Sequence, residues 1–448
     1  MIIMRKYSLF IAFWTMGTLA ISAQETADTT VTTSMIEPQS YLLTLNECLQ
    51  YAFGNSYERQ NLALTEKSAA ESTKQARNER RPNVSFSASE SARHTGSSDQ
   101  INFGGNVGLN GGVAIYQGGA ISKNIKRSQM EEESTRLRTA KYDNSLSIEI
   151  LNAYLAVLKN RETLKSKESI VETSREQAEM GRKKYDAGKL LESDCLVLEA
   201  QYASNRMDTL DARIARTTNL LTLKKLMSMD PLAQLDLVEP DTTAIDAMAM
   251  LPEQEECVSK AMQSMPEMRL SENAIEIAEI QTKITKAAYR PTISASAGLS
   301  ASHMDFDEVG KQMRDNFTQQ VGISLSMPIY DRGQTKSRLA QNRYSKQQAE
   351  LDKAQTELEI KQTVINQYQN VRLAYERYKI TKQRCEAYKA VLSVFNAKFN
   401  VGSVVITDLL QQQDNYINSI NEYVQAKYAF ILNRKILDVY MGDGVRMD

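Results

Sequence analysis

The sequence is poor in the residues on which most catalytic and metal sites depend. Its 448 residues include 2 histidines and 4 cysteines. Four cysteines are too few for a disulfide scaffold in a chain of this length. Gly-x-Ser-x-Gly, His-Glu-x-x-His and Gly-x-x-x-x-Gly-Lys segments are absent as well, so nothing favours a hydrolase, a zinc protease or a phosphate-binding loop. We therefore expect no enzymatic activity, no catalytic residues, no metal site and no cofactor.

Excess charge and long apolar runs are also lacking. The 54 lysines and arginines balance 55 aspartates and glutamates, which argues against nucleic acid as a partner. After the first residues, no apolar run reaches the roughly 18 residues of a membrane-spanning helix, so any membrane segment must consist of β-strands. Only 19 glycines and 8 prolines are present, as is typical of long uninterrupted helices.

The N-terminus has the pattern of a secretory signal peptide. Arg5 and Lys6 precede a mostly apolar stretch over 7–20, and small residues lead to a cleavage site near Ala23. This stretch is too short for a spanning helix. Residues 1–23 are predicted to be removed, and residues 24–41 to form a flexible linker in an exported protein.

Most of the remaining chain consists of two copies of one unit. Residues recur 209 positions later near the start of each unit and 214 positions later further on. The matched pairs are Glu47–Cys48 with Glu256–Cys257, Arg81–Pro82 with Arg290–Pro291, His94 with His303, Tyr116 with Tyr330, Gly188 with Gly402, Asp194 with Asp408, and Met227 with Met441. The pattern predicts a first repeat over 42–228, a connector over 229–252, a second repeat over 253–442, and a tail over 443–448.

Each unit has the same predicted order of elements. A short helix (45–55; 254–264) is followed by a longer helix that ends at an Arg-Pro pair, because proline disfavours a helical residue before it. Two strands follow, over about 83–92 and 106–116 in the first unit and about 292–301 and 320–330 in the second. A very long helix (121–182; 335–398), a glycine turn and a returning helix complete the unit.

The predicted strands alternate between apolar and small polar residues. Val84, Phe86 and Ala88 alternate with serines, and the other three strands repeat this pattern. In a soluble sandwich the outward face usually carries charged residues, whereas an apolar face opposite a small polar face is typical of a membrane barrel. Because lipid permits no open sheet edge and four strands cannot close a barrel, several chains must contribute.

The returning helices carry apolar residues every seven positions, a spacing that predicts a coiled-coil seam. The rows on the second are Leu410, Ile417, Val424 and Ile431, and Leu409, Tyr416, Tyr423, Phe430 and Leu437. The rows on the first are Met207, Ile214 and Leu221, and Leu196, Ala203 and Leu210. Two adjacent rows on one helix favour a closed ring of helices.

Over about Leu42 to Gly442, the chain resembles the TolC family of outer-membrane efflux and type I secretion proteins. The resemblance rests on Leu43–Ala52 and its copy around Glu256, the Arg-Pro pairs at Pro82 and Pro291, Pro328–Gly333, Tyr116–Gly119, and the glycine turns followed by Asp194 and Asp408. It implies a mainly α-helical homotrimer, with a small membrane β part. A twelve-strand β-barrel in outer-membrane lipid would be continuous with a twelve-helix α-barrel in the periplasm of a Gram-negative envelope. It also implies an equatorial belt around 231–252 and the C-terminal end, a periplasmic adaptor, and an inner-membrane pump of the RND or ABC type.

The resemblance also indicates site residues. Asp408 and Asp194 would line the periplasmic tip, where three copies of Asp408 would form a carboxylate ring that favours cations; the alternative is simple stabilisation of a helix N-terminus. Gln411 stands where the family has a second acid. The tip turns Gly188 and Gly402, together with Phe399 and Val404, would serve gating and adaptor docking. Phe399 and Val404 replace a tyrosine and an arginine, so we expect a mainly hydrophobic latch. The barrel-to-helix transition would involve Pro82, Pro291, Pro328, Gly119 and Gly333.

Three further groups have a plain interpretation and a functional one. Methionine is more often packing filler than a ligand for soft metal ions. The methionines concerned are Met227, Met229, Met248, Met250, Met262, Met265 and Met268. His94 and His303 are expected to be surface polar residues, and Cys48 and Cys257 buried free thiols.

The preferred hypothesis is a passive outer-membrane duct for small molecules expelled by a pump. A type I protein secretion duct is an alternative, and a soluble periplasmic coiled-coil scaffold is a rival that predicts charged outward strand faces.

Overall fold

The computed structural model describes residues 40–95, 98–239 and 250–444. The predicted signal peptide, most of the linker and part of the connector lie outside these residues. The helices are α1 Leu45–Asn55, α2 Tyr57–Asn78, α3 Ala120–Asp186, α4 Glu192–Leu226, α5 Gln254–Ser264, α6 Pro266–Ala287, α7 Val309–Asp315, α8 Gln334–Val401 and α9 Ile406–Met441. The strands are β1 Ser40–Leu43, β2 Asn83–Thr95, β3 Ser98–Gln117, β4 Gln234–Leu237, β5 Thr292–His303 and β6 Thr318–Ser326.

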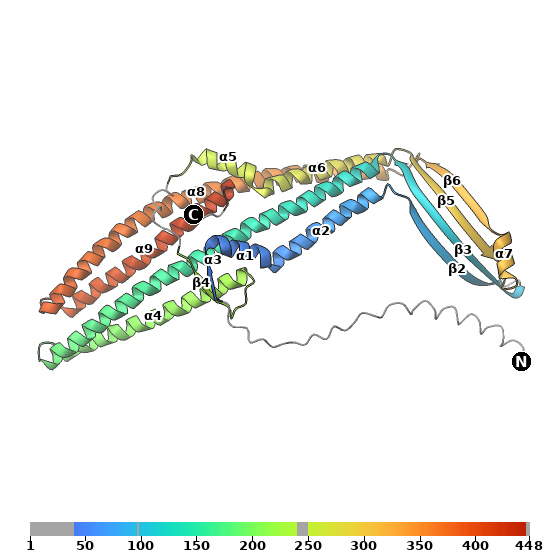
Figure 1. Cartoon of the computed structure of the whole chain (residues 1–448). Coiled ribbons are helices and arrows are strands. Elements are labelled where there is room, and N and C mark those ends of the chain that lie inside the picture. Colours follow the sequence, from blue (N-terminus) through green and yellow to red (C-terminus); the bar gives the residue numbers. More distant parts are fainter. Residues whose placement is uncertain (1–39, 96–97, 240–249, 445–448) are drawn as a thin grey trace, which may run out of the picture. The chain divides into compact units, whose positions relative to one another are not determined.

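The two longest helices are as uninterrupted as the scarcity of proline and glycine predicts. α3 has 67 residues and α8 has 68, so each extends over roughly 100 Å at 1.5 Å per residue. Each ends at a glycine with a left-handed backbone, at Gly188 (φ +66°) and Gly402 (φ +76°). Both predicted glycine turns are therefore confirmed, and the chain reverses there into α4 and α9 (Figure 1).

The helices form two rows that share α3 and α8. In the half nearer the sheet, α2, α3, α6 and α8 lie side by side in that order (Figure 1). In the other half the order is α4, α3, α9 and α8. Each row therefore begins with a helix from the first repeat and ends with α8 from the second.

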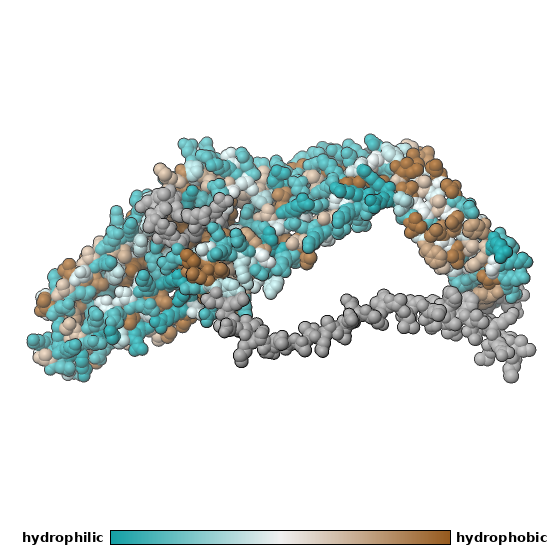
Figure 2. Space-filling view, viewed as in Figure 1, coloured by the Kyte–Doolittle hydropathy of each residue, from teal (hydrophilic) through white to brown (hydrophobic). Residues whose placement is uncertain are grey.

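The four long strands form one antiparallel sheet in the order β2-β3-β5-β6. Register places Phe86 opposite Leu109, and Leu109 opposite Leu299, so apolar residues of neighbouring strands share one face. Val84, Phe86, Val321 and Ile323 are exposed on it, and Figure 2 shows apolar side chains gathered over the sheet. The alternation predicted for these strands is present, with serines, glycines and asparagines on the opposite face.

Some boundaries differ from the prediction. β6 ends at Ser326, short of the predicted residue 330, because Pro328 lacks the N–H that a ladder requires. β3 begins earlier than predicted, at Ser98, and a short helix, α7, that was not predicted precedes β6. The last two residues of the predicted linker belong to β1, which pairs with β4 in parallel.

The main core lies where α1, β4, α5 and the middle of the long helices meet, with Tyr154, Phe430, Leu223 and Ile150 fully buried. A second, smaller cluster joins the ends of the two long hairpins. Within the described residues, no helix is long and apolar enough to cross a membrane.

The seven-residue rows have different surroundings on the two returning helices. On α9, Leu409, Val424, Phe430 and Ile431 are buried, which confirms the predicted seam. On α4, the row of Met207, Ile214 and Leu221 is exposed, so the seam predicted there has no partner within the described part of the chain and stays a prediction. α4 instead buries the row of Leu198, Asn205 and Ala212, which leaves its apolar row unpartnered among the described residues.

Candidate functional site

The tip of each long hairpin is a turn set by its backbone. At the first tip, Gly188 N–H donates to the Tyr185 carbonyl (2.8 Å) and Lys189 N–H to the Lys184 carbonyl (2.8 Å). Gly402 and Ser403 make the matching bonds at the second tip. This pattern satisfies the last carbonyls of α3 and α8. The tips are therefore hydrogen-bonded turns that fix where α4 and α9 begin.

The two tips are joined by a small apolar cluster. Phe399 is 3% exposed and packs with Leu198, Ile406 and Leu409, and the half-buried Val404 lies against the same cluster. The structure thus brings Phe399 and Val404 together, as a hydrophobic contact between tips requires.

A cation reinforces this contact. The Lys184 ammonium on α3 donates to the Phe399 carbonyl and lies 4.2 Å from the centre of the Phe399 ring. Burial lowers the pKa of Lys184, a sign that part of its hydration is lost here. Gln177 Nε2 donates to Asn396 Oδ1 at 2.8 Å, a second link between α3 and α8. The structure thus has a charged contact beside the apolar one, and the mainly hydrophobic latch stays a prediction.

The predicted acidic residues lie at the starts of the returning helices. Asp194 is half-buried in the first turn of α4, and Asp408 is exposed in the first turn of α9. Gln411 is exposed one turn further on and donates to Asn415 Oδ1 at 3.4 Å. Asp414, which the sequence reading did not single out, follows on the same helix, and burial raises the pKa of its carboxyl.

The sheet-to-helix transition uses the predicted prolines and glycines. Pro82 and Pro291 directly precede β2 and β5. Gly119 (φ +87°) and Gly333 (φ +77°) are the N-caps of α3 and α8. Pro328 lies between β6 and α8. All five residues therefore stand at changes of backbone direction.

The close packing at this transition is most severe at Gly118. A Cβ there would lie 2.5 Å from the carbonyl oxygen of Ala287, and its φ is +62°. At the equivalent place in the second repeat, Asp331 carboxylate oxygens accept from Gly333 N–H (3.0 Å) and Thr335 N–H (2.8 Å). A hydrogen bond from the Thr335 side chain lowers the pKa of Asp331 most, and the two backbone N–H bonds lower it further.

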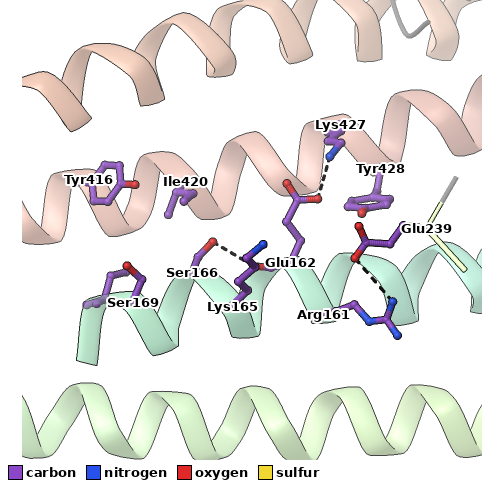
Figure 3. A pocket seen from close by; sticks show the side chains of 11 residues that line it. Arg161, Glu162, Lys165, Ser166, Ser169, Glu239, Tyr416, Ile420, Lys427 and Tyr428 are labelled. Carbon is purple, nitrogen blue, oxygen red and sulfur yellow. Dashed lines mark hydrogen bonds and ion pairs between the residues drawn. The ribbon is translucent and has the colours of Figure 1, made fainter. Parts of the chain in front are cut away.

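A polar cavity of about 470 Å³ lies between α3 and α9 (Figure 3). Lys427 on α9 pairs with Glu162 on α3 at 2.9 Å, and Arg161 contacts Glu239 at 3.6 Å. Burial raises the pKa of the Tyr428 hydroxyl beside this pair. The cavity marks the level at which the main core ends and the two hairpins continue toward their tips.

The remaining methionines and cysteines mostly fit their interpretation as packing residues and free thiols. Met227, Met229 and Met268 are buried in the main core, Met250 is exposed, and residue 248 lies outside the described part. Cys48 and Cys257 are buried free thiols, as predicted.

The two repeat-equivalent histidines differ. His94 is exposed, but His303 is only 6% exposed and contacts Glu90. The expectation of a surface residue is wrong for His303, because its partner lies 213 residues away on another strand.

Comparison with known proteins agrees with this architecture. The family model described as "Outer membrane efflux protein" matches residues 49–228 and 257–443. The chain is 22% identical over 256 residues to the outer membrane efflux protein BepC of Brucella suis, covering 55% of this chain and 52% of that protein. It is 22% identical over 321 residues to the alkaline protease secretion protein AprF of Pseudomonas aeruginosa, covering 71% of this chain and 65% of AprF.

Among solved structures, the outer membrane protein VceC of Vibrio cholerae has the same fold. The TM-score is 0.73 at 17% identity, and the superposition covers 90% of this chain and 97% of VceC. The sequence alignments to BepC and AprF span only about half and two thirds of those proteins' lengths.

Proposed function

The chain belongs to the outer membrane efflux protein family, and from this premise we propose that it forms a homotrimeric channel-tunnel that conducts substrates expelled by an inner-membrane pump. Family membership confirms the resemblance and the outer-membrane location expected from the sequence. In the proposed trimer, three four-strand sheets close a twelve-strand β-barrel, and the helices form a twelve-helix α-barrel that extends into the periplasm.

The single observation that carries this proposal is the unfinished sheet. Its outer strands, β2 and β6, each have a free edge among the described residues, and its apolar face is exposed, with Val321 85% accessible. Lipid covers an apolar face but cannot satisfy the hydrogen bonds of an open edge. Pairing β6 of one copy with β2 of the next satisfies the backbone hydrogen bonds of both edge strands, and a closed ring of copies leaves no open edge.

The helices support the same arrangement, in which the β6 side of one copy meets the β2 side of the next. The row that begins with α4 ends with α8, and both helices expose apolar residues at seven-residue spacing. The exposed row on α8 comprises Tyr344, Leu351 and Leu358 and then, shifted by one position from that register, Leu373, Ile380, Val394 and Val401. α8 lies on the same side of the chain as β6, and α2 and α4 lie on the side of β2. A rotation that pairs β6 with β2 of the next copy therefore also places α8 against α2 and α4 of that copy.

In this assembly the tip is the gate. The contact of Lys184 and Phe399, with Val404 in the same apolar cluster, holds the first hairpin against the second. Asp408, Asp194 and Gln411 supply the polar lining at the narrowest level, where three Asp408 carboxylates would favour cations over anions. The turns at Gly188 and Gly402 face the periplasm, where an adaptor would dock.

The pump and adaptor supply energy and choose the substrate, because the chain itself offers a passive duct. Small-molecule efflux, with an RND or ABC pump, is the primary proposal. Type I protein secretion is a second candidate, favoured by the similarity to AprF, which is named as a secretion protein for alkaline protease. The small serine, glycine and asparagine side chains on the polar face of the sheet suit either cargo.

Conductance in planar lipid bilayers tests the proposal. Purified full-length protein should insert as discrete steps of equal conductance, because each step is one closed barrel. A variant with Val321→Asp and Ile323→Asp, which places charges on the lipid face, should not insert. Absence of any steps with the unmodified protein, under conditions in which a control porin inserts, would refute the channel.

A further inference from the structure

Glu90, Gly105 and His303 form one row across β2, β3 and β5. Gly105 has no side chain, so Glu90 and His303 meet above it, with His303 Nε2 3.0 Å from Glu90 Oε2. A Cβ at Gly105 would lie 2.2 Å from that carboxylate oxygen and 2.3 Å from the ring nitrogen. The contact therefore exists only because the middle strand has glycine at this position.

The second ring nitrogen of His303 contacts the connection between β5 and β6. His303 Nδ1 lies 2.9 Å from the carbonyl oxygen of Asp305. The Phe306 ring lies 5.9 Å from the imidazole and 4.8 Å from the Phe103 ring. These contacts leave His303 6% exposed, so water has little access to the imidazole, whereas the Glu90 side chain is 39% exposed.

Both nitrogens of His303 therefore face oxygen atoms that accept hydrogen bonds. A carbonyl oxygen only accepts, so Nδ1 must carry a proton to bond Asp305. A neutral imidazole has a single N–H, which leaves Nε2 as an acceptor opposite a carboxylate that also only accepts. The observed geometry thus requires one additional proton, on Nε2 or on Glu90.

The elements around this pair carry further polar and charged groups in the described part of the chain. β2 contributes Glu90, and β3 contributes the uncharged Gly105 and Phe103. The connection contributes Asp305, whose carboxylate accepts from Gln312 Nε2 (2.5 Å) and Asp307 N–H (2.9 Å). α7 presents the uncharged Gln312. α7 also carries the cations Lys311 and Arg314, and β2 carries Arg93. Lys311 pairs with Glu308 at 3.2 Å, and among the described residues the ion pair of Glu90 is with His303.

We propose that Glu90 and His303 form a proton-dependent anchor for the β5–β6 connection, residues 304–317. While the pair holds its extra proton, the connection is fixed through the Asp305 carbonyl and through Phe306. When rising pH removes that proton, two acceptors face each other 3.0 Å apart, and the anchor is released.

Hydrogen exchange measured by mass spectrometry on the full-length protein in detergent tests this anchor. Rates at pH 6 and pH 9 are expressed as protection factors, which remove the intrinsic pH dependence of exchange. Protection of residues 304–317 should fall by about ten-fold or more at pH 9, as expected for loss of a hydrogen bond to a charged group. Protection of α6, which precedes the end of β5 opposite to His303, should not change.

Glu90→Gln is the decisive variant. Its amide N–H can donate to the neutral Nε2, so the connection should keep its pH 6 protection at pH 9. Gly105→Ala, which separates the pair, should give low protection at both pH values. Equal protection of the unmodified protein at the two pH values would overturn the proposal, and so would a Glu90→Gln variant that loses protection as the unmodified protein does.

Discussion

Replacing Lys184 with methionine should open the proposed gate. Methionine keeps much of the length of the side chain but has no ammonium group. It therefore loses both the hydrogen bond to the Phe399 carbonyl and the contact with the Phe399 ring at 4.2 Å. The apolar cluster around Phe399 remains, so the substitution removes the charged component of the tip contact alone.

The size of the effect follows from these two contacts. A hydrogen bond from a charged donor contributes about 1.5–3 kcal/mol, and a cation over an aromatic ring about 0.5–2 kcal/mol. Burial lowers the pKa of Lys184, which means that desolvation of the ammonium offsets part of this gain. A net loss of about 1–2 kcal/mol shifts the closed–open equilibrium of each chain's tip by roughly 5–30-fold toward open, and the shift for the trimer is larger where the three tips open together.

Single-channel recording in planar bilayers measures that shift as the open probability. Lys183→Met is the matched control, since Lys183 is an exposed lysine of the same helix, one position earlier. We expect Lys184→Met to raise the open probability and Lys183→Met to leave it unchanged. If the two variants behave alike, Lys184 does not hold the tip closed.

Four further substitutions or treatments test other parts of the account. Asp408→Ala should weaken cation preference, seen as a reversal potential closer to zero in a salt gradient; an unchanged potential would remove Asp408 from the pore lining. Gly118→Ala should destabilise the protein by about 1–2 kcal/mol or more in thermal unfolding, because its φ is +62° and a Cβ would meet the α6 carbonyl. Gly310→Ala, whose Cβ would point into open space, should be neutral, and equal melting temperatures of the two variants would contradict this. Burial raises the pKa of Cys48 to about 12, so its thiolate is scarce at pH 8, and iodoacetamide should label Cys48 far more slowly in the folded protein than in urea; similar rates would show that the thiol is accessible. Leu373→Glu, on the exposed row of α8, should dissociate the trimer on native gels without unfolding the monomer, and a trimer of normal stability would place the interface elsewhere.

Elements with local signals were predictable from the sequence. α1 and α5 begin and end where predicted. For α1, Thr44 accepts from Glu47 N–H and the Glu47 side chain accepts from Thr44 N–H, a pair that is visible in the sequence as a capping box. The ends of α3 and α8 follow from Gly188 and Gly402 for the same reason, since a left-handed residue ends a helix wherever it stands.

Contacts between distant residues were not predictable. Lys184 and Phe399 lie 215 positions apart and Glu90 and His303 lie 213 apart, and no periodicity links them. The exposed row on α4 shows a related limit, because seven-residue spacing indicates that a helix has a packing face without indicating the partner. The spacing of Met207 and Ile214 predicted a seam on α4, but α3 packs on the other face of that helix.

Native mass spectrometry of the protein extracted from outer membranes in mild detergent tests the central claim most directly. The account predicts a stable trimer, because each chain supplies four strands with two open edges and only a closed ring satisfies them. A monomer recovered in the soluble fraction would contradict the channel and would favour a periplasmic scaffold.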